Sequence, residues 1–550
     1  MRFARPVRWL VALYGGATLP IEAAGITAGN RTEGHRVLGS TKGVVVRDYE
    51  SYVKGLERQG VIPDPQRRQR VIEDQIAVIC KKTGFRLHLD SDLLDQAVYT
   101  TECPNAIIGS FKEAYLEVPQ EILVTSMKEH QGFFSLMHKD TGKLVPHFIA
   151  VTNNRAKDMG LIREGNERVL AARLADAKFF FDEDRKTRLE DRVEKLRGVT
   201  FHQRLGTLYD KTERNEKLVG ILAIDTGNQG VIDISRRSAR LANTDLLTAI
   251  VGEFPTLQGV MGGEYAKLAG EDPQVSKALT EQYLPRGMEG AIPESLVGRL
   301  YSLADRLGKI VGFFRVGIVP KGSEDPYALR RDALSIVRIL VEGDGITLNL
   351  SEALDKAEDI FDAANISKQR AGISQGAFDF IVERFRYYAG TAGGIKRDDV
   401  INAVLSLANI RTRSFRELLS LMKALEAVTT ESEFDPLIIG FKRAHRLVEK
   451  EQWDRKPVDR ARFEHPTESA LYQATADERD TMKSAIDCGD YSQALNSLVR
   501  LKPAIDAFFA AVMVNADDPA VRSNRLSLLK HVDDLFMSFA DFSQIVVQGG

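Results

Sequence analysis

The chain has 550 residues, of which 43% are hydrophobic and 28% are charged. This length excludes a single hydrophobic core, because it predicts roughly three or four domains. Lysine and arginine total 75 against 77 acidic residues, so the near-neutral net charge neither supports nor excludes nucleic-acid binding. The three cysteines form no CxxC pair, which argues against a zinc half-site and a disulfide scaffold and favours a reducing cytoplasm.

Residues 1–170 are predicted to form an α+β domain. Short runs rich in β-branched and aromatic residues, mostly flanked by Gly, Asn or Pro, are typical of strands. These runs are residues 7–14, 42–49, 121–127 and 143–153. Helical segments interrupt them, such as residues 65–82, where Ile72, Ile76 and Ile79 recur at helical spacing.

The apolar run at residues 7–14 has a second interpretation. Arg2, Arg5 and Arg8 lie at its start, as in a secretory signal with a basic beginning and an apolar core. The uninterrupted apolar part covers only residues 9–14, which is too short for a signal. We therefore interpret residues 7–14 as a buried strand that ends in a turn. No stretch of the chain has the apolar length that a membrane span requires.

From residue 168 onward, the spacing of apolar residues becomes helical. We assign residues 171–345 to a helical middle domain, 346–430 to a helical connector and 431–550 to a helical last domain. The clearest helix covers residues 293–314, where apolar steps of three and four predict one buried stripe. Asp325-Pro326 then predicts an N-cap with proline in the first helical position. The predicted fold class is mainly α, multidomain, with an N-terminal α+β domain.

Motifs of nucleotide and metal chemistry are missing from the sequence. The chain has no GxxxxGK[ST], no GxGxxG after a strand and no HExxH. Its one GxSxG string, residues 372–376, follows a polar segment instead of an apolar strand, so we interpret it as an interhelical turn. The nine histidines are scattered singly. We therefore expect no catalytic centre and no metal site in this chain.

The last predicted helix begins at Asp518-Pro519 and carries a basic residue on its apolar side. Its apolar arc consists of Leu528, Leu529, Val532, Phe536 and Phe539. Arg525 lies on the same arc, with Arg522 one turn earlier, and a desolvated guanidinium needs a partner. That partner is either a carboxylate such as Asp506 or Asp517, or a phosphate or base of RNA. The sequence leaves both alternatives open.

Three further basic groups have the same two interpretations. They are Arg236, Arg237 and Arg240; Arg330 and Arg331 with Arg338; and Arg36, in the glycine-containing loop of residues 29–40. Basic runs of this kind are usually solvated helix faces or simple turns, and less often line a groove for nucleic acid.

Ordered blocks along nearly the whole chain resemble one family, the β subunit of the bacterial glycyl-tRNA synthetase built from two kinds of subunit. The blocks are FARPVRWLVALYG from Phe3, GHR from Gly34, VTNN from Val151, GEFPTLQGVMGGEYA from Gly252, IPESLVGRLYSLADRL from Ile292, VGFF from Val311, DPYALRRDALSIVRIL from Asp325, FDPLIIGFKRA from Phe434, HPTESALYQA from His465 and FFAAVMVNADDPAVRSNRLSLL from Phe508.

The resemblance implies a division of labour between two chains. The family's ATP and glycine sites lie on a separate α subunit, and the β subunit recognises glycine tRNA in a heterotetramer of two α and two β subunits. ATP and Mg²⁺ would then serve the holoenzyme, with no cofactor bound by this cytoplasmic chain. The last domain resembles the anticodon-binding domain of arginyl-type synthetases, which implies that Arg522, Asn524, Arg525 and Lys530 lie near the anticodon stem.

The other parts of the chain carry resemblances of their own. Residues 1–170 resemble the tRNA-binding and editing module of the phenylalanyl β subunit, and the middle domain resembles an HD-type phosphohydrolase. An active HD site needs an adjacent His-Asp pair, because the two side chains share a metal. No such dipeptide occurs here, Asn243-Thr244-Asp245 stands near the expected place, and only His202 and Asp305 suit the outer positions. We expect the metal site to be lost.

Two rival functions follow from these comparisons: a divergent HD-type phosphohydrolase, and an interaction scaffold that does not contact RNA. Family members also usually begin upstream with an acidic EIGTEELP-like stretch, whereas this chain begins at the MRFARPVRW block. We therefore expect a shortened first domain, with unpaired strands and a weaker contact with the α subunit.

Overall fold

The computed structural model describes residues 7–224, 226–369, 371–451 and 453–547. Arg2 and Arg5 thus lie outside the described residues. The chain divides into two compact units, residues 1–188 with 245–264, and residues 189–244 with 265–550. No helix in the described part is both long and apolar enough to cross a membrane.

The first unit begins with two-residue strands paired in hairpins. They are β1 (Leu13–Tyr14), β2 (Ala17–Thr18), β3 (Glu22–Ala23), β4 (Ile26–Thr27), β5 (Arg31–Thr32) and β6 (Val44–Val45). Helix α1 (Tyr49–Arg58) follows, and a small core forms from Val44, Val46 and Leu56. The buried strand predicted at residues 7–14 is wrong. Only Leu13 and Tyr14 form a strand, which pairs with Ala17 and Thr18 across the Gly15-Gly16 turn. Trp9 and Tyr14 remain exposed.

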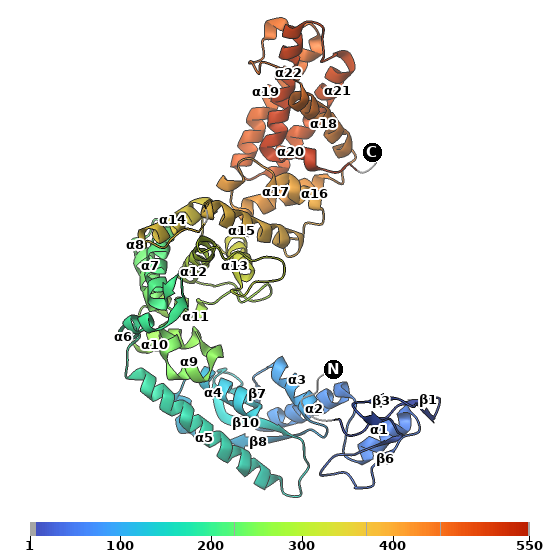
Figure 1. Ribbon diagram of the computed structural model, residues 1–550, viewed down its shortest axis with the longest axis vertical. Coiled ribbons are helices and arrows are strands. Elements are labelled where there is room, and N and C mark those ends of the chain that lie inside the picture. Colours follow the sequence, from blue (N-terminus) through green and yellow to red (C-terminus); the bar gives the residue numbers. More distant parts are fainter. Residues whose placement is uncertain (1–6, 225, 370, 452, 548–550) are drawn as a thin grey trace. The chain divides into compact units, whose positions relative to one another are not determined.

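An antiparallel sheet forms the centre of the first unit (Figure 1). Its order is β7 (Phe85–Leu87), β9 (Phe133–His138), β10 (Leu144–Thr152), β8 (Asn105–Ser110). Helices α2 (Pro65–Thr83) and α3 (Ser91–Thr100) bury Ile72, Ile76 and Leu93 against Phe134 and Ile149 of the sheet. The predicted helix at 65–82 and the predicted strand at 143–153 are confirmed.

The strand predicted at residues 121–127 is a helix in the structure. Helix α4 (Gln120–Ser126) starts after Pro119 and continues into a π-helical turn, η2 (Met127–Gln131). Ile122, Leu123 and Met127 are fully buried, and this spacing matches one face of a helix, not alternate residues of a strand. A short 3-10 helix, η1 (Glu113–Glu117), precedes α4.

The long helix α5 (Met159–Arg185) runs through the predicted domain boundary at residue 170. Near its end, it is hydrogen-bonded to residues 249 and 250. Its buried Asp184 accepts hydrogen bonds from the backbone N–H groups of Ala249 and Ile250, at 2.8 and 3.0 Å. These residues begin α9 (Ala249–Glu253), which η5 (Pro255–Leu257) follows. The carboxylate thus caps α9 from a distant part of the chain.

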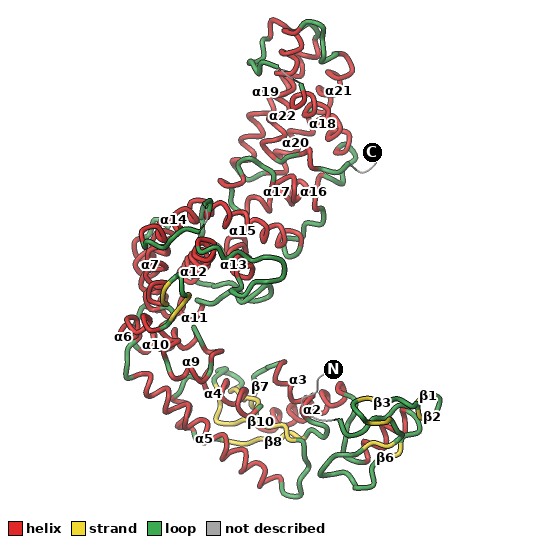
Figure 2. The backbone as a smooth tube through the Cα atoms, viewed as in Figure 1, coloured by secondary structure: helices red, strands yellow, loops and turns green. Residues whose placement is uncertain are grey.

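The second unit is almost entirely helical in its described residues, apart from the hairpin β11 (Thr200–His202) and β12 (Gly206–Thr207) (Figure 2). Its first part contains α6 (Leu189–Val193), η3 (Glu194–Gly198), α7 (Leu208–Ile224), α8 (Gln229–Leu241), α11 (Pro273–Glu281), α12 (Leu296–Arg315) and α13 (Leu329–Glu342); η4 (Thr244–Leu247) and α10 (Val260–Leu268) span the boundaries between the units.

Helix α12 corrects two predictions. It is buried around nearly its whole circumference, not along one stripe, because α7, α8, α11, α13, α14 (Leu350–Ala363) and α15 (Ile373–Gly390) all contact it. The next helix begins at Leu329, so Pro326 lies in the preceding turn and not in the first helical position. Asp325 nevertheless caps that helix, since its carboxylate accepts from the N–H groups of Leu329 and Arg330.

Helices continue to the end of the chain. They are α14 (Leu350–Ala363), α15 (Ile373–Gly390), α16 (Asp398–Leu405), η6 (Ile410–Thr412), α17 (Phe415–Val428), α18 (Phe434–Lys450), η7 (Arg460–Arg462), α19 (Pro466–Asp487), α20 (Tyr491–Arg500), α21 (Lys502–Ala511), α22 (Pro519–Phe539) and η8 (Phe542–Gln544). The predicted cap of α22 by Asp518 and its buried apolar arc are confirmed. Phe441 of α18 stacks on Phe536 of α22 at 4.7 Å.

Candidate nucleic-acid interface

Arg525 on α22 is held in a buried ion-pair network. Its side chain is 9% exposed, and Glu468, its partner on α19, is completely buried. Nε donates to Glu468 at 2.9 Å and Nη2 to Glu464 at 2.8 Å. The carboxylates are therefore not Asp506 or Asp517, the two partners that the sequence suggested. The third donor, Nη1, binds the backbone carbonyl of Met513 at 3.0 Å, so Arg525 also holds the segment after α21.

The neighbouring residues of α22 are also occupied within the domain. The Asn524 amide accepts from the backbone N–H of Asp459 at 2.7 Å and donates to its carbonyl at 3.0 Å. Lys530 forms ion pairs with Asp533 and Asp534, both at 2.9 Å. Arg522 is half-buried, and within the described residues its guanidinium makes no hydrogen bond or ion pair. Of these four residues, only Arg522 keeps an unoccupied charge.

A cleft of about 830 Å³ lies beside α18 and α21 in the same domain. Three cations line it from one side of α18, namely Lys442, Arg443 and Arg446. Lys442 donates to the backbone carbonyl of Ile545 at 2.6 Å. The Arg443 guanidinium carbon lies 4.3 Å from the ring centroid of Phe509 on α21, a stacked arrangement that leaves the guanidinium edge available to a ligand.

Apolar side chains complete this α18/α21 cleft. Ile439 is 59% exposed and Met513 is 77% exposed, and both line the cleft with Phe509. Proteins that bind single-stranded nucleic acid combine cations that contact the backbone with aromatic or apolar surfaces on which unpaired bases stack. The cleft contains both kinds of side chain, and the bond from Arg525 to Met513 fixes one of its walls.

Two of the three arginines in the basic cluster on α8 form ion pairs with carboxylates. Arg237 forms ion pairs with Glu190 and Glu271, and Arg240 with Glu190 and, at 3.9 Å, with Glu216. Burial alone would raise the pKa of Glu190, but hydrogen bonds from Arg237 and Arg240 outweigh this effect and lower that pKa. Arg236 is exposed, and its guanidinium lies over Gly220 of α7, where a β-carbon would clash with it.

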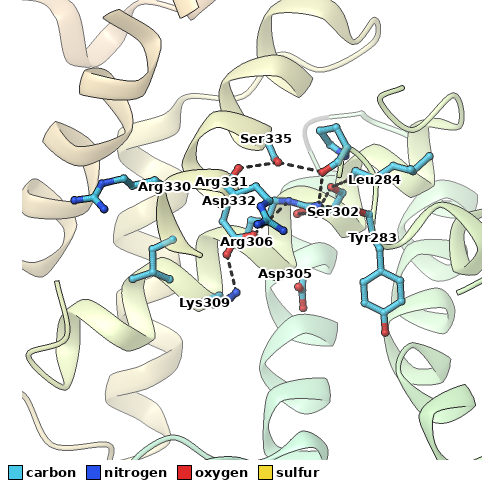
Figure 3. Close-up of polar contacts among 12 residues, drawn as sticks. Tyr283, Leu284, Ser302, Asp305, Arg306, Lys309, Arg330, Arg331, Asp332 and Ser335 are labelled. Atoms are coloured by element: carbon cyan, nitrogen blue, oxygen red, sulfur yellow. Dashed lines mark hydrogen bonds and ion pairs between the residues drawn. The ribbon is translucent and has the colours of Figure 1, made fainter. Parts of the chain in front are cut away.

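The three arginines of α13 do not form one surface. Arg330 donates to the backbone carbonyls of Gly322 and Glu324, at 2.7 and 3.3 Å, and Figure 3 shows it pointing away from the other labelled residues. Arg331 is exposed. Arg338 is buried, and it pairs with Glu342 and with the carbonyls of Gly287 and Gly290.

A buried polar network joins α12 and α13 to the segment after α11 (Figure 3). Arg306 of α12 is 6% exposed, and it donates to the backbone carbonyls of Tyr283, Pro285 and Ser302. Asp332 of α13 lies 2.8 Å from Lys309 and 3.8 Å from Arg306. The hydrogen bonds of Arg306 and the ion pair of Lys309 with Asp332 link α12 to α13 and to the segment after α11, although Nε of Arg306 is buried without a hydrogen-bond partner.

The positions that resemble an HD site are occupied by other contacts. Asp305 accepts from Lys211 at 2.7 Å and from Asn215 at 2.6 Å. Burial alone would raise the pKa of Asp305, but the Lys211 ammonium, together with Arg306 and Asn215, outweighs this effect and lowers that pKa. His202 instead packs edge-on against Phe313 and Tyr327. In the part of the chain that the structure describes, no three His, Cys, Asp or Glu side chains are grouped as metal ligands.

The N-terminal loop brings together two of the sequence blocks. His35, 4% exposed, bonds through Nε2 to the backbone carbonyl of Asn153 at 2.9 Å. Its Nδ1 accepts from the N–H groups of Val37 and Leu38 at 3.2 Å. Arg36 points outward and is exposed. The GHR block and the VTNN block thus meet through His35, which fixes the loop against the end of β10.

The glycines of GVMGGEY surround a buried carboxylate. Asp245 is 1% exposed and accepts from the N–H of Gly259. A β-carbon on Gly262 would lie 3.2 Å from the same carboxylate oxygen. Burial raises the pKa of Asp245. These glycines therefore permit close approach of the backbone to Asp245, and they do not indicate a phosphate loop.

The cleft residues Lys442, Arg443, Arg446 and Phe509 were missed in the sequence. A signal was present, because FKRAHR places cations at positions 442, 443 and 446 of one amphipathic helix. Whether these cations can contact a ligand depends on how much of α18 is covered by α21 and by the segment around Met513. Only the tertiary structure shows this.

Comparison with known proteins assigns the family. A family model described as glycyl-tRNA synthetase beta subunit matches residues 1–406, and one described as DALR anticodon binding domain matches residues 437–540. The chain belongs to the glycyl-tRNA synthetase β subunit family. It is a subunit of a glycine–tRNA ligase, and helices α18 to α22 make up most of its anticodon-binding domain.

Curated relatives agree with this assignment. The glycine–tRNA ligase β subunit of Geobacter sp. strain M21 is 41% identical over 545 residues. Those of Trichlorobacter lovleyi and Myxococcus xanthus are each 40% identical, over 550 and 549 residues. Each match covers 99% of this chain and 77% of the relative.

Proposed function

We propose that this chain binds glycine tRNA and that a separate α subunit attaches glycine to it with ATP and Mg²⁺. The observation that carries the proposal is the α18/α21 cleft, which combines Arg443, Arg446 and Phe509 inside the domain matched by the anticodon-binding family. In this account the mechanism is positional. Cations set the register of the RNA backbone, and stacking contacts hold unpaired bases of the anticodon loop.

We place the main RNA contacts at this cleft and not on α22. Arg525, Asn524 and Lys530 already bind partners inside the domain, and withdrawing them would leave buried polar groups unpaired. Arg522 stays a proposed phosphate contact. Arg36, Arg236 and Arg331 are exposed and stay proposed contacts with other parts of the tRNA, whereas Arg237, Arg240 and Arg330 are already engaged within the protein.

The remaining assignments also stay proposals. They are an assembly of two α and two β subunits in the cytoplasm, a tRNA-binding or editing-like module in residues 1–170, an HD-like domain without a metal in 171–345 and a connector in 346–430. The ion pair of Lys211 with Asp305 supports the third of these, because an ammonium group there satisfies the carboxylate in place of a metal.

Equilibrium binding of glycine tRNA at several stated salt concentrations tests the cleft. The double variant Arg443→Gln/Arg446→Gln should bind at least tenfold more weakly and give a shallower dependence on salt by about one to two units of slope, since each lost phosphate contact to a single strand removes about 0.7. The matched control is Lys423→Gln/Lys450→Gln, which removes two exposed charges that do not line the cleft. Equal affinity in both variants would overturn this placement.

The two rival functions have separate tests. A scaffold that does not contact RNA would show no saturable binding of glycine tRNA by the wild-type chain. A metal-dependent phosphohydrolase would release phosphate from nucleotides and would contain stoichiometric metal when the purified chain is analysed. We expect tRNA binding and neither of the other two results.

A further inference from the structure

A second cleft of about 500 Å³ lies in the same unit, where the segment before α17 meets α19 and α22. Met482, Ile486 and Leu535 provide apolar lining. The polar lining includes Arg413 from the connector and Arg479 and Lys483 from α19. Neither the proposed anticodon contacts nor the family assignment accounts for this set of cations.

Arg413 is buried without a full set of partners. Its side chain is 9% exposed, yet Nη1 has no hydrogen-bond partner. The carboxylate of Glu417 lies 3.6 Å from Nη1, beyond a good hydrogen bond. Its other bonds, to Asn409 and to the carbonyl of Ser538, are both long at 3.4 Å. A buried guanidinium in this state is costly unless a further acceptor binds it.

Arg479 and Lys483 stand one turn apart on α19, so that like charges face each other, which destabilises a helix. Both are exposed, and neither forms a hydrogen bond or ion pair with any residue that the structure describes. On the neighbouring helix α20, by contrast, Arg500 pairs with Glu478 at 2.6 Å. The pair on α19 therefore places two unneutralised charges beside the cleft.

The carboxylates that line the cleft do not neutralise these cations. Asp534 is held by Lys530 at 2.9 Å, and no ion pair within the described residues joins Asp487 to Arg479 or Lys483. His531 also lines the cleft. Burial first, and then the positive charge of Arg479, lower the pKa of His531 despite the opposing effect of Asp534. The cleft is thus short of negative charge.

We propose that this cleft binds a phosphate group, which is contacted by Arg479 and Lys483 beside the guanidinium of Arg413. A phosphate offers several strong acceptor oxygens and a charge that matches such a group of cations. The phosphate belongs either to the backbone of bound RNA or to a free phosphate compound. In both cases it would join the connector residue Arg413 to the last domain.

Calorimetric titration of the full chain with inorganic phosphate tests the site. We expect saturable binding that weakens at least tenfold in Arg479→Gln/Lys483→Gln and stays unchanged in Lys423→Gln/Lys450→Gln. Phosphate should also raise the pKa of His531, followed by NMR of its imidazole, because a bound anion favours the charged ring. If wild-type protein binds no phosphate saturably and the pKa of His531 does not move, these cations serve only the carboxyl ends of α19 and α22, and the proposal fails.

A second measurement identifies the source of the phosphate and, in this part, rests on the proposed function. If the ligand is RNA backbone, Arg479→Gln/Lys483→Gln should reduce the salt slope of glycine tRNA binding by about one. An unchanged slope together with saturable phosphate binding assigns the site to a free phosphate compound. If the chain binds no tRNA at all, the proposed function fails, while the phosphate titration still decides this inference.

Discussion

Arg525 and Met513 are joined by a hydrogen bond of 3.0 Å from the guanidinium Nη1 to the backbone carbonyl. The same guanidinium is neutralised by Glu468 and Glu464. One buried arginine therefore connects the core of the anticodon-binding domain to the segment that forms a wall of the α18/α21 cleft. This connection makes Arg525 a positioning residue, whose loss affects both folding and the shape of the cleft.

Replacing Arg525 by methionine should lower the free energy of unfolding by about 3–5 kcal/mol, because the completely buried Glu468 loses its partner. Urea unfolding of the full chain measures this change. The double variant Arg525→Met/Glu468→Gln should recover part of the loss, and Arg522→Met should stay within about 0.5 kcal/mol of wild type. A loss as small as that of Arg522→Met would contradict the role given to Arg525.

Gly262→Ala should destabilise the first unit by about 1–3 kcal/mol, because the new methyl group would meet the buried Asp245 carboxylate at 3.2 Å. Thermal unfolding provides the measurement. Gly252→Ala is the matched control, since its methyl group would meet no atom within 4 Å and alanine suits a helix better than glycine. Equal melting temperatures for the two variants would show that the contact with Asp245 carries no constraint.

The pKa of Glu190 is lowered in the folded protein, so its ion pairs contribute stability at pH values above its unfolded pKa of about 4.3. That contribution is lost as the pH falls through the lower, folded value. Urea midpoints between pH 3 and pH 7 should therefore fall less steeply on acidification in Glu190→Gln than in wild type. Parallel curves for the two proteins would mean that Glu190 does not titrate as the structure implies.

His35→Phe should cost about 1–3 kcal/mol, because it removes the acceptor of the Val37 and Leu38 N–H groups and the bond to Asn153. Hydrogen exchange should speed up locally, in residues 33–40 and around Asn153. Arg36→Gln, at the exposed neighbouring position, should leave exchange unchanged. The same exchange rates in wild type, His35→Phe and Arg36→Gln would show that the hydrogen bonds of His35 do not hold the loop in place.

Local patterns in the sequence predicted the regular helices well, since α2 and α22 carry clear caps and apolar faces. They failed where tertiary contacts decide. Residues 121–127 have strand-like composition but lie in a helix after Pro119, and α12 is covered on all sides by helices that its own spacing does not reveal.

Tertiary contacts also limited what could be predicted of the candidate site. The sequence indicated that Arg525 needs a partner, but its carboxylates lie 57 and 61 residues away along the chain. Spacing within α22 carries no information on residues so distant. The cations of α18 were not predicted as ligand contacts, because this role depends on the open cleft beside Phe509, which forms only in the folded domain.

Cross-linking tests the central claim, that unpaired anticodon bases bind in the α18/α21 cleft, most directly. Glycine tRNA carrying 4-thiouridine in its anticodon loop would be irradiated with the full chain, and the linked peptides identified by mass spectrometry. We predict links to residues 439–447 and 509–515, lost in Arg443→Gln/Arg446→Gln. Links confined to other helices, or none while the tRNA remains bound, would contradict the account.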